Sequence, residues 1–211
     1  LSGLFSSGES EKVKPLILKS IDLGNCVSIL CISGIIGVSQ TFAVFYFGKN
    51  FAPVGSLLGV GASTIFFLAL TNALSTQYLL AAKKMHEYMM STIVGLIVNI
   101  VFNLTLIPIL GTMGAIIATI LTEVGVASYI LWKLRDLFGL REVFHGVWKY
   151  LIGGVLVFIF LDLINKTVPA SISSYLIQTI IAVLIYSVTL YVLRAPVNAL
   201  ISPYIKKIVK R

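Results

Sequence analysis

The chain alternates between long apolar runs and short polar stretches, and six of the runs have the length of a membrane-spanning helix. A helix rises about 1.5 Å per residue, so ~20 apolar residues cross a hydrocarbon core of about 30 Å. Most of the runs are separated by short stretches with Gly or Pro, where helices reverse outside the hydrocarbon. The pattern predicts an all-α membrane protein with spans at 21–47, 57–82, 88–109, 113–132, 150–164 and 175–193.

Three further stretches are polar or mixed. Residues 1–20 carry Lys12, Lys14 and Lys19 and are expected to form a cytosolic lead-in or a linker between two lobes. Residues 194–211 are expected to form a basic cytosolic tail. Residues 134–148 place apolar side chains at helical spacing beside charged ones, which is typical of a helix lying flat on the inner leaflet.

Composition removes the soluble alternatives. Hydrophobic residues make up 58% of the chain and charged residues 11%, and the mean hydropathy is +1.00, far from the values of soluble domains. A net charge of +8 in a soluble protein would suggest a nucleic-acid partner. Here the cations stand at the ends of the apolar runs, so the expected partners are membrane lipids and no nucleic acid.

The loops also predict the orientation. Lys49 and Lys166 fall in loops on one side of the predicted spans, and the other 14 of the 16 Lys and Arg residues fall on the opposite side. Cytosolic loops carry the excess of cations. We therefore expect a multi-pass protein of the plasma membrane with both ends in the cytosol.

Polar residues inside two neighbouring spans indicate a cavity. Asn99 and Asn103 stand four apart before the turn near Gly111, and Thr119 and Glu123 repeat that spacing after it. An amide or carboxyl without a partner is costly in lipid, so these groups are expected to face protein or a water-filled cavity.

Glu123 is the first candidate for chemistry. A carboxylate at mid-span opposes insertion by about 2.5 to 3.5 kcal/mol, which roughly cancels the apolar residues around it. Such a group either belongs to a proton relay or is a hydrogen-bonded carboxyl that joins helices. Both interpretations stay open from the sequence.

The second span carries a polar patch that ends in two cations. Its amides and hydroxyls suit a sugar-bearing ligand and suit hydrogen bonds between helices equally well. The cations are expected at the inner mouth of the cavity. The patch consists of Thr71, Asn72, Ser75, Thr76 and Gln77, followed by Lys83 and Lys84. On the fourth span, Gly114, Ala118 and Thr122 form a line of small residues that allows close helix contact.

These positions carry a family likeness. The spacing of Asn99, Asn103, Pro108, Gly111, Gly114, Ala115, Ala118, Thr119 and Glu123, together with the upstream runs FGKNFAPVG and ALSTQYLLAAKK, resembles the C-terminal half of polysaccharide and oligosaccharide-lipid flippases. These flippases belong to the multidrug, oligosaccharidyl-lipid and polysaccharide (MOP) exporter superfamily. The likeness covers roughly residues 1–135.

The resemblance implies one six-helix lobe of a twelve-helix, MATE-like transporter in a bacterial inner membrane. It also implies a lipid-linked oligosaccharide as substrate, moved by alternating access, and an N-terminal six-helix lobe of the same protein as partner. A chain that begins with Leu, and a likeness that begins at the family's seventh span, agree with that expectation. The family is expected to hold its anionic headgroup with intramembrane cations, whereas no Lys or Arg occurs in the predicted spans.

Other functions remain open from the sequence. A multidrug and toxic-compound exporter would use acidic and aromatic groups, and a membrane-embedded transferase or scaffold subunit belongs to a different class. The sequence contains no GxSxG, HExxH or P-loop motif, so no enzyme is expected. His86 and His145 have no His or Cys partner at ligand spacing, and we expect neither a metal nor a cofactor.

Overall fold

The structure, a computed structural model, describes residues 13–199, and every regular element in this part of the chain is helical. The long helices are α2 (Val13–Phe47), α5 (Met85–Leu110), α6 (Thr112–Lys133), α8 (Val147–Asn165) and α9 (Ile172–Val192). Shorter elements are the 3-10 helix η2 (Lys49–Phe51), the α-helices α3 (Ala52–Gly61), α4 (Thr64–Thr71) and α7 (Leu140–Val143), and the π-helix η3 (Asn72–Leu79).

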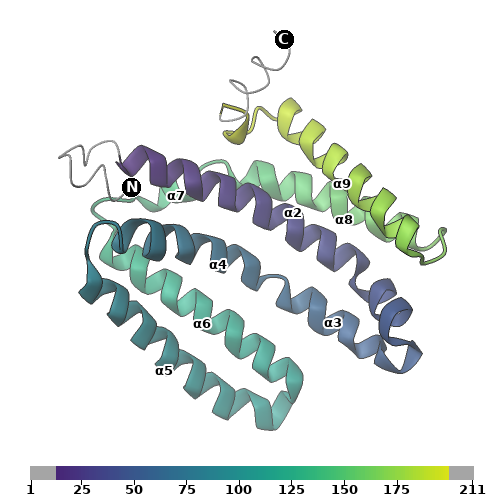
Figure 1. Ribbon diagram of the computed structural model, residues 1–211, viewed down its shortest axis with the longest axis horizontal. Helices are drawn as coiled ribbons and strands as arrows, with labels where there is room; N and C mark the ends of the chain where they lie inside the picture. The colour runs from purple at the N-terminus through teal and green to yellow at the C-terminus, as the bar shows by residue number, and fades with distance from the viewer. Residues whose placement is uncertain (1–12, 200–211) are drawn as a thin grey trace. The chain divides into compact units, whose positions relative to one another are not determined.

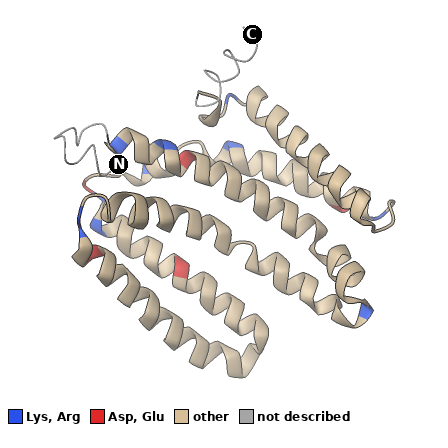
Figure 2. Cartoon of the chain, viewed as in Figure 1, with Lys and Arg blue, Asp and Glu red and all other residues tan. Residues whose placement is uncertain are grey.

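Six stretches of these helices are long and apolar enough to cross a membrane. The prediction of an all-α membrane protein with six spans is confirmed. Figure 2 shows Lys, Arg, Asp and Glu mostly near helix ends, with one acidic position well inside α6, the helix that carries Glu123. The predicted tail 194–211 lies outside the described residues from 200 onward, and the lead-in lies outside them up to 12.

The first helix begins at Val13, before the expected position 21. Val13, Ile17 and Ile21 recur every four residues and are almost fully buried, with exposed fractions of 1%, 0% and 2%. Buried apolar residues at this spacing lie on one face of a helix, so packing extends α2 into the stretch that was expected to be a polar lead-in.

The second span is a broken helix, which the sequence did not predict. It covers Lys49–Leu79 and consists of η2, α3, α4 and η3, with an interruption after Gly61. Three glycines in α3 weaken its helical preference. In η3 the backbone widens, and the Leu80 N–H donates to the Ser75 carbonyl, five residues back, at 3.1 Å.

The described residues fall into two compact units. Unit 1 contains residues 13–24 and 63–145, so it includes the start of α2 and α4 to α7. Unit 2 contains residues 25–62 and the described residues from 146 onward, so it includes the rest of α2, α3, α8 and α9.

In unit 1, α5 and α6 run side by side as a hairpin (Figure 1). The turn between them is at Gly111, whose φ of 57° and ψ of −135° favour a residue without a side chain. Just beyond it, a Cβ on Gly114 would overlap the carbonyl oxygen of Leu106 and lie 2.6 Å from its carbonyl carbon. The line of small residues on α6 therefore does bring the two backbones into close contact.

The stretch 134–148 is packed into protein at several of the positions that we expected to lie on the inner leaflet. Leu134, Phe138 and Val143 have exposed fractions of 3%, 1% and 2%. Phe138 makes an edge-on ring contact with Tyr78, with the centroids 5.1 Å apart. The flat-helix interpretation is therefore wrong for these residues, because the core of unit 1 provides the apolar surface that they cover.

Unit 2 is organised around α2, α8 and α9. The Tyr186 hydroxyl of α9 donates to the Cys26 carbonyl of α2 at 2.8 Å in the interior of the unit. The Asn165 side chain, at the end of α8, donates to the Gly37 carbonyl at 2.9 Å, and Gln178 of α9 donates to Asn165 at 3.1 Å. Hydrogen bonds to backbone carbonyls thus join three helices without a charged side chain.

Candidate functional site

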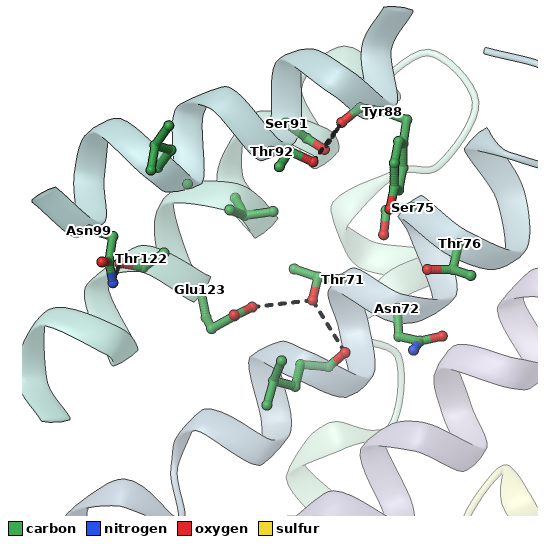
Figure 3. Close-up of a pocket in the computed structure, with 14 residues that line it drawn as sticks. Thr71, Asn72, Ser75, Thr76, Tyr88, Ser91, Thr92, Asn99, Thr122 and Glu123 are labelled. Carbon is green, nitrogen blue, oxygen red and sulfur yellow. Dashed lines mark hydrogen bonds between the residues drawn. The ribbon is translucent and has the colours of Figure 1, made fainter. Parts of the chain in front are cut away.

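Unit 1 contains a cavity of about 490 Å³ between three helical segments. Its wall is formed by the α4–η3 segment, by α5 and by α6 (Figure 3). Most of the lining side chains are polar but uncharged. The lining consists of Leu68, Thr71, Asn72, Ser75, Thr76, Tyr88, Ser91, Thr92, Gly95, Leu96, Asn99, Thr122, Glu123 and Val126.

Among the described residues that line the cavity, Glu123 is the one charged residue, and none is Lys or Arg. Its Oε2 accepts a hydrogen bond from the Thr71 hydroxyl at 3.3 Å, across from α6 to the end of α4 (Figure 3). Thr71 is only 5% exposed, whereas Glu123 is half-buried at the cavity wall. The carboxyl is therefore held by protein on one side and faces the cavity on the other.

A second polar link joins α5 to α6 next to this pair. The Asn99 amide donates to the Thr122 hydroxyl at 3.2 Å, and Thr122 donates in turn to the Ala118 carbonyl at 2.8 Å. Asn103 lies one turn further along α5 and donates to the Asn99 carbonyl at 2.9 Å and to its side-chain oxygen at 3.0 Å. Asn103 supports Asn99 but is not part of the lining.

The α5 wall near the start of the helix is built by hydroxyls. Ser91 and Thr92 both donate to the Tyr88 carbonyl, at 2.7 and 3.2 Å (Figure 3). These bonds use the hydroxyl protons, which leaves the oxygens as acceptors toward the cavity. The Tyr88 ring also belongs to the wall, and an aromatic ring beside hydroxyls and amides suits the mixed apolar and polar faces of a sugar.

The cavity opens to the outside of unit 1. Asn72, Thr76 and Thr92 are exposed, and Leu68 and Leu96 are 49% and 58% exposed. A polar, open concavity with one carboxyl can bind a polyhydroxylated or cationic group through neutral donors and acceptors. It is poorly suited to hold a phosphate by itself, because no cation balances the charge.

The structure brings together five of the residues expected at the site: Asn72, Ser75, Thr76, Asn99 and Glu123. It places Gln77 elsewhere, where its side-chain oxygen accepts from the Ser20 hydroxyl at 2.6 Å. Thr119 is exposed, and its hydroxyl donates to the Ala115 carbonyl of its own helix. Thr119 stands on the same face of α6 as Glu123 but one turn further along the helix, and it lies outside the lining.

Lys83 and Lys84 follow η3 and are exposed, outside the lining. Lys83 adopts a φ of 57°, which is unusual for a residue with a side chain, and the Lys84 ammonium lies 5.8 Å from the centre of the Tyr78 ring. Within residues 13–199, no group of three His, Cys, Asp or Glu side chains could hold a metal ion.

Sequence reasoning did not include several lining residues among the candidates. Tyr88 and Ser91 carry no distinctive motif, although Ser91 stands four and eight residues before Gly95 and Asn99 on one helical face. Thr122 was expected only as a packing residue in the line of small residues. Thr71 belongs to the predicted polar patch, but its contact with Glu123 spans 52 positions and depends on the tertiary fold.

Neither a family model nor a curated protein matches the chain. Among solved structures, the chain is similar to the lipid II flippase MurJ in an inward closed conformation, with a TM-score of 0.69 and 16% sequence identity. The match covers 90% of this chain and 43% of that chain, so the chain spans less than half the length of this structural neighbour. The chain therefore has the fold of a part of that flippase.

Proposed function

We propose that the protein is one lobe of a flippase that moves a lipid-linked oligosaccharide across the membrane. The observation that carries this proposal is the cavity of unit 1, whose wall offers amides, hydroxyls and an aromatic ring within a membrane-spanning bundle. The fold similarity to a lipid flippase supports it. The expected likeness to polysaccharide and oligosaccharide-lipid flippases supplies the finer substrate class.

The sugar would bind in the cavity and Glu123 would couple transport to protons. Lys83 and Lys84 would attract the anionic headgroup at the cytosolic mouth, since the cavity wall has no cation of its own. Both ends of the chain would lie in the cytosol, in a bacterial inner membrane. A second six-helix lobe of the same protein, preceding this one, would cover the open side of the cavity and provide the surface against which this lobe rocks.

The test is transport in liposomes that contain a fluorescent polyprenyl-diphosphate disaccharide. The full protein should move the probe between leaflets, and Glu123→Gln should slow it roughly tenfold at unchanged expression, because Gln keeps the shape but releases no proton. Glu87→Gln is the matched control, since Glu87 lies on α5 outside the lining. Normal transport by Glu123→Gln would leave Glu123 with a structural role only.

The same liposomes test the second lobe. A demonstrated monomer of these 211 residues should not move the probe alone. Movement by the monomer would refute the half-transporter proposal, and movement by a dimer alone would favour two copies related by an axis along the membrane normal.

A multidrug exporter is the second candidate. The lone carboxyl beside the Tyr88 ring, in a lining without Lys or Arg, favours an organic cation. Tetraphenylphosphonium efflux from the same liposomes separates the two candidates: efflux without movement of the disaccharide lipid would select the exporter.

A further inference from the structure

Thr71 occupies a junction between two kinds of helix. It is the last residue of α4, and the π-helix η3 begins at the next residue. Its hydroxyl lies 3.3 Å from the Glu123 carboxylate and 3.2 Å from the Leu68 carbonyl, three residues back in α4. A hydroxyl carries one proton, so Thr71 cannot donate to both acceptors at once.

The protonation state of Glu123 decides which acceptor receives that proton. When Glu123 is ionised, the carboxylate is the stronger acceptor and takes the Thr71 proton. When Glu123 is protonated, its own O–H can donate to the Thr71 oxygen, and Thr71 is then free to donate to Leu68. Both short contacts are used in the second state, and the direction of the Glu123–Thr71 hydrogen bond is reversed. The added proton comes from water through the open cavity, and no covalent bond other than this O–H forms or breaks.

The change of hydrogen-bond acceptor at Thr71 affects the cavity wall directly. A Thr hydroxyl that donates back to a carbonyl of its own helix bends or loosens that turn. In α4 this turn is the one from which η3 starts, and η3 carries Asn72, Ser75 and Thr76 of the lining. A π-helix has one more residue in each hydrogen-bonded turn than an α-helix. Conversion of η3 from a π-helix to an α-helix would therefore turn the side chains that follow by about 100°.

No second carboxyl and no Lys, Arg or His of the described lining competes for the Glu123–Thr71 hydrogen bond. Tyr88 of α5 is the one further titratable residue in the described lining, and the lining residues of α4, η3 and α6 add none besides Glu123. Tyr78 of η3 is buried against Phe138 instead.

We propose that Thr71 is a positioning residue that couples the protonation of Glu123 to the conformation of η3, and through it to the sugar-binding wall of the cavity. This inference rests on the proposed function, because it assigns the coupling step of that transport. Thr71 does not need to touch the substrate.

The first experiment detects the hydrogen bond without transport. Infrared spectra of the purified protein in lipid nanodiscs, recorded across a pH titration, contain the C=O band of protonated Glu123, which Glu123→Gln identifies by its loss. Thr71→Val should move this band to higher wavenumber, and Thr71→Ser should leave it in place. Thr105→Val is the matched control, because Thr105 donates to its own helix at Val101 and lies outside the lining. An unchanged band in Thr71→Val would overturn the proposal.

The second experiment measures coupling. In the liposomes described above, Thr71→Val should reduce proton-driven movement of the disaccharide lipid roughly tenfold, the effect of one hydrogen bond to a charged group, and should flatten its dependence on pH. Thr71→Ser should restore both. A Thr71→Val protein with the wild-type rate and pH profile would overturn the proposal.

The proposed function and the coupling role of Thr71 can fail separately. If the wild-type protein moves no disaccharide lipid but the infrared band responds to Thr71→Val and not to Thr105→Val, the proposed function fails and the Glu123–Thr71 pair stands. If transport is present and Thr71→Val behaves as Thr105→Val does, the proposed function stands and the coupling role of Thr71 fails.

Discussion

The close approach of α5 and α6 near Gly114 gives the sharpest test of the packing. A Cβ at this position would lie 2.6 Å from the Leu106 carbonyl carbon and 3.0 Å from the Ile107 nitrogen. Carbon atoms rest about 3.5 to 4.0 Å apart, so Gly114→Ala must push the α5 backbone back by nearly 1 Å. Backbone cannot change rotamer as a side chain can, and overpacking of this kind costs about 1–3 kcal/mol.

A matched glycine isolates that steric cost. Gly24 also lies inside a helix of unit 1, and a Cβ there would meet Ala69 at an ordinary 3.5 Å. Both substitutions gain about 0.5–1 kcal/mol from the better helical preference of Ala, so this gain cancels when the two variants are compared. We expect Gly114→Ala to be less stable than Gly24→Ala by about 1–3 kcal/mol.

Equilibrium unfolding of both variants by SDS in mixed micelles, followed by Trp fluorescence, measures the difference. Gly24→Ala should be at least as stable as the wild type. Equal midpoints and slopes for the two variants would refute the close backbone contact between α5 and α6.

Three further predictions concern the core and the topology. Phe138→Ala should lower the free energy of unfolding by about 3–5 kcal/mol in the same SDS titration and Phe144→Ala much less, since their exposed fractions are 1% and 39%; equal losses would contradict the burial of 134–148. Tyr186→Phe should lower the free energy of unfolding by about 0.5–1.5 kcal/mol, because the hydrogen bond to the Cys26 carbonyl is lost. Tyr191→Phe should change it little, since Tyr191 is 77% exposed. An unchanged stability of Tyr186→Phe would show that this hydrogen bond does not stabilise unit 2. Single cysteines in a background without Cys26 and Cys31 should be labelled from outside at positions 49 and 166 but not at 84 and 141, and the reverse pattern would refute the orientation.

The number of helices could be predicted from the sequence because span length is set by the membrane. The run 113–132 was expected, and α6 covers Thr112–Lys133. The broken second span could not be predicted, because hydropathy averages over the interruption after Gly61 and over the change from α4 to η3. The start of α2 at Val13 was missed because Lys14 and Lys19 dominate the local composition, although the apolar face was present at positions 13, 17 and 21.

The candidate site was predictable only as far as helical spacing reaches. Asn99 and Glu123 were found because a polar residue inside a span is costly and therefore conspicuous. Their contacts with Thr122 and Thr71 could not be predicted, because hydroxyl residues of this kind also occur in spans without a cavity. Spacing also did not show that Gln77 would contact Ser20, or that Thr119 would lie one turn beyond the lining.

Polar and apolar side chains are both exposed around the mouth of the cavity, and neither lipid nor water alone suits both kinds. Asn72, Thr76 and Thr92 are polar and exposed, while Leu68 and Leu96 beside them are apolar and exposed. Hydrocarbon would suit the leucines but leave the amide and hydroxyls without partners, and water would reverse the preference. A protein surface with its own polar and apolar groups satisfies both sets, and it is also the arrangement in which Glu123 can meet a proton from a water-filled cavity. For this reason the α4–η3 and α5 faces at the mouth of the cavity are the surface that the proposed second lobe would cover.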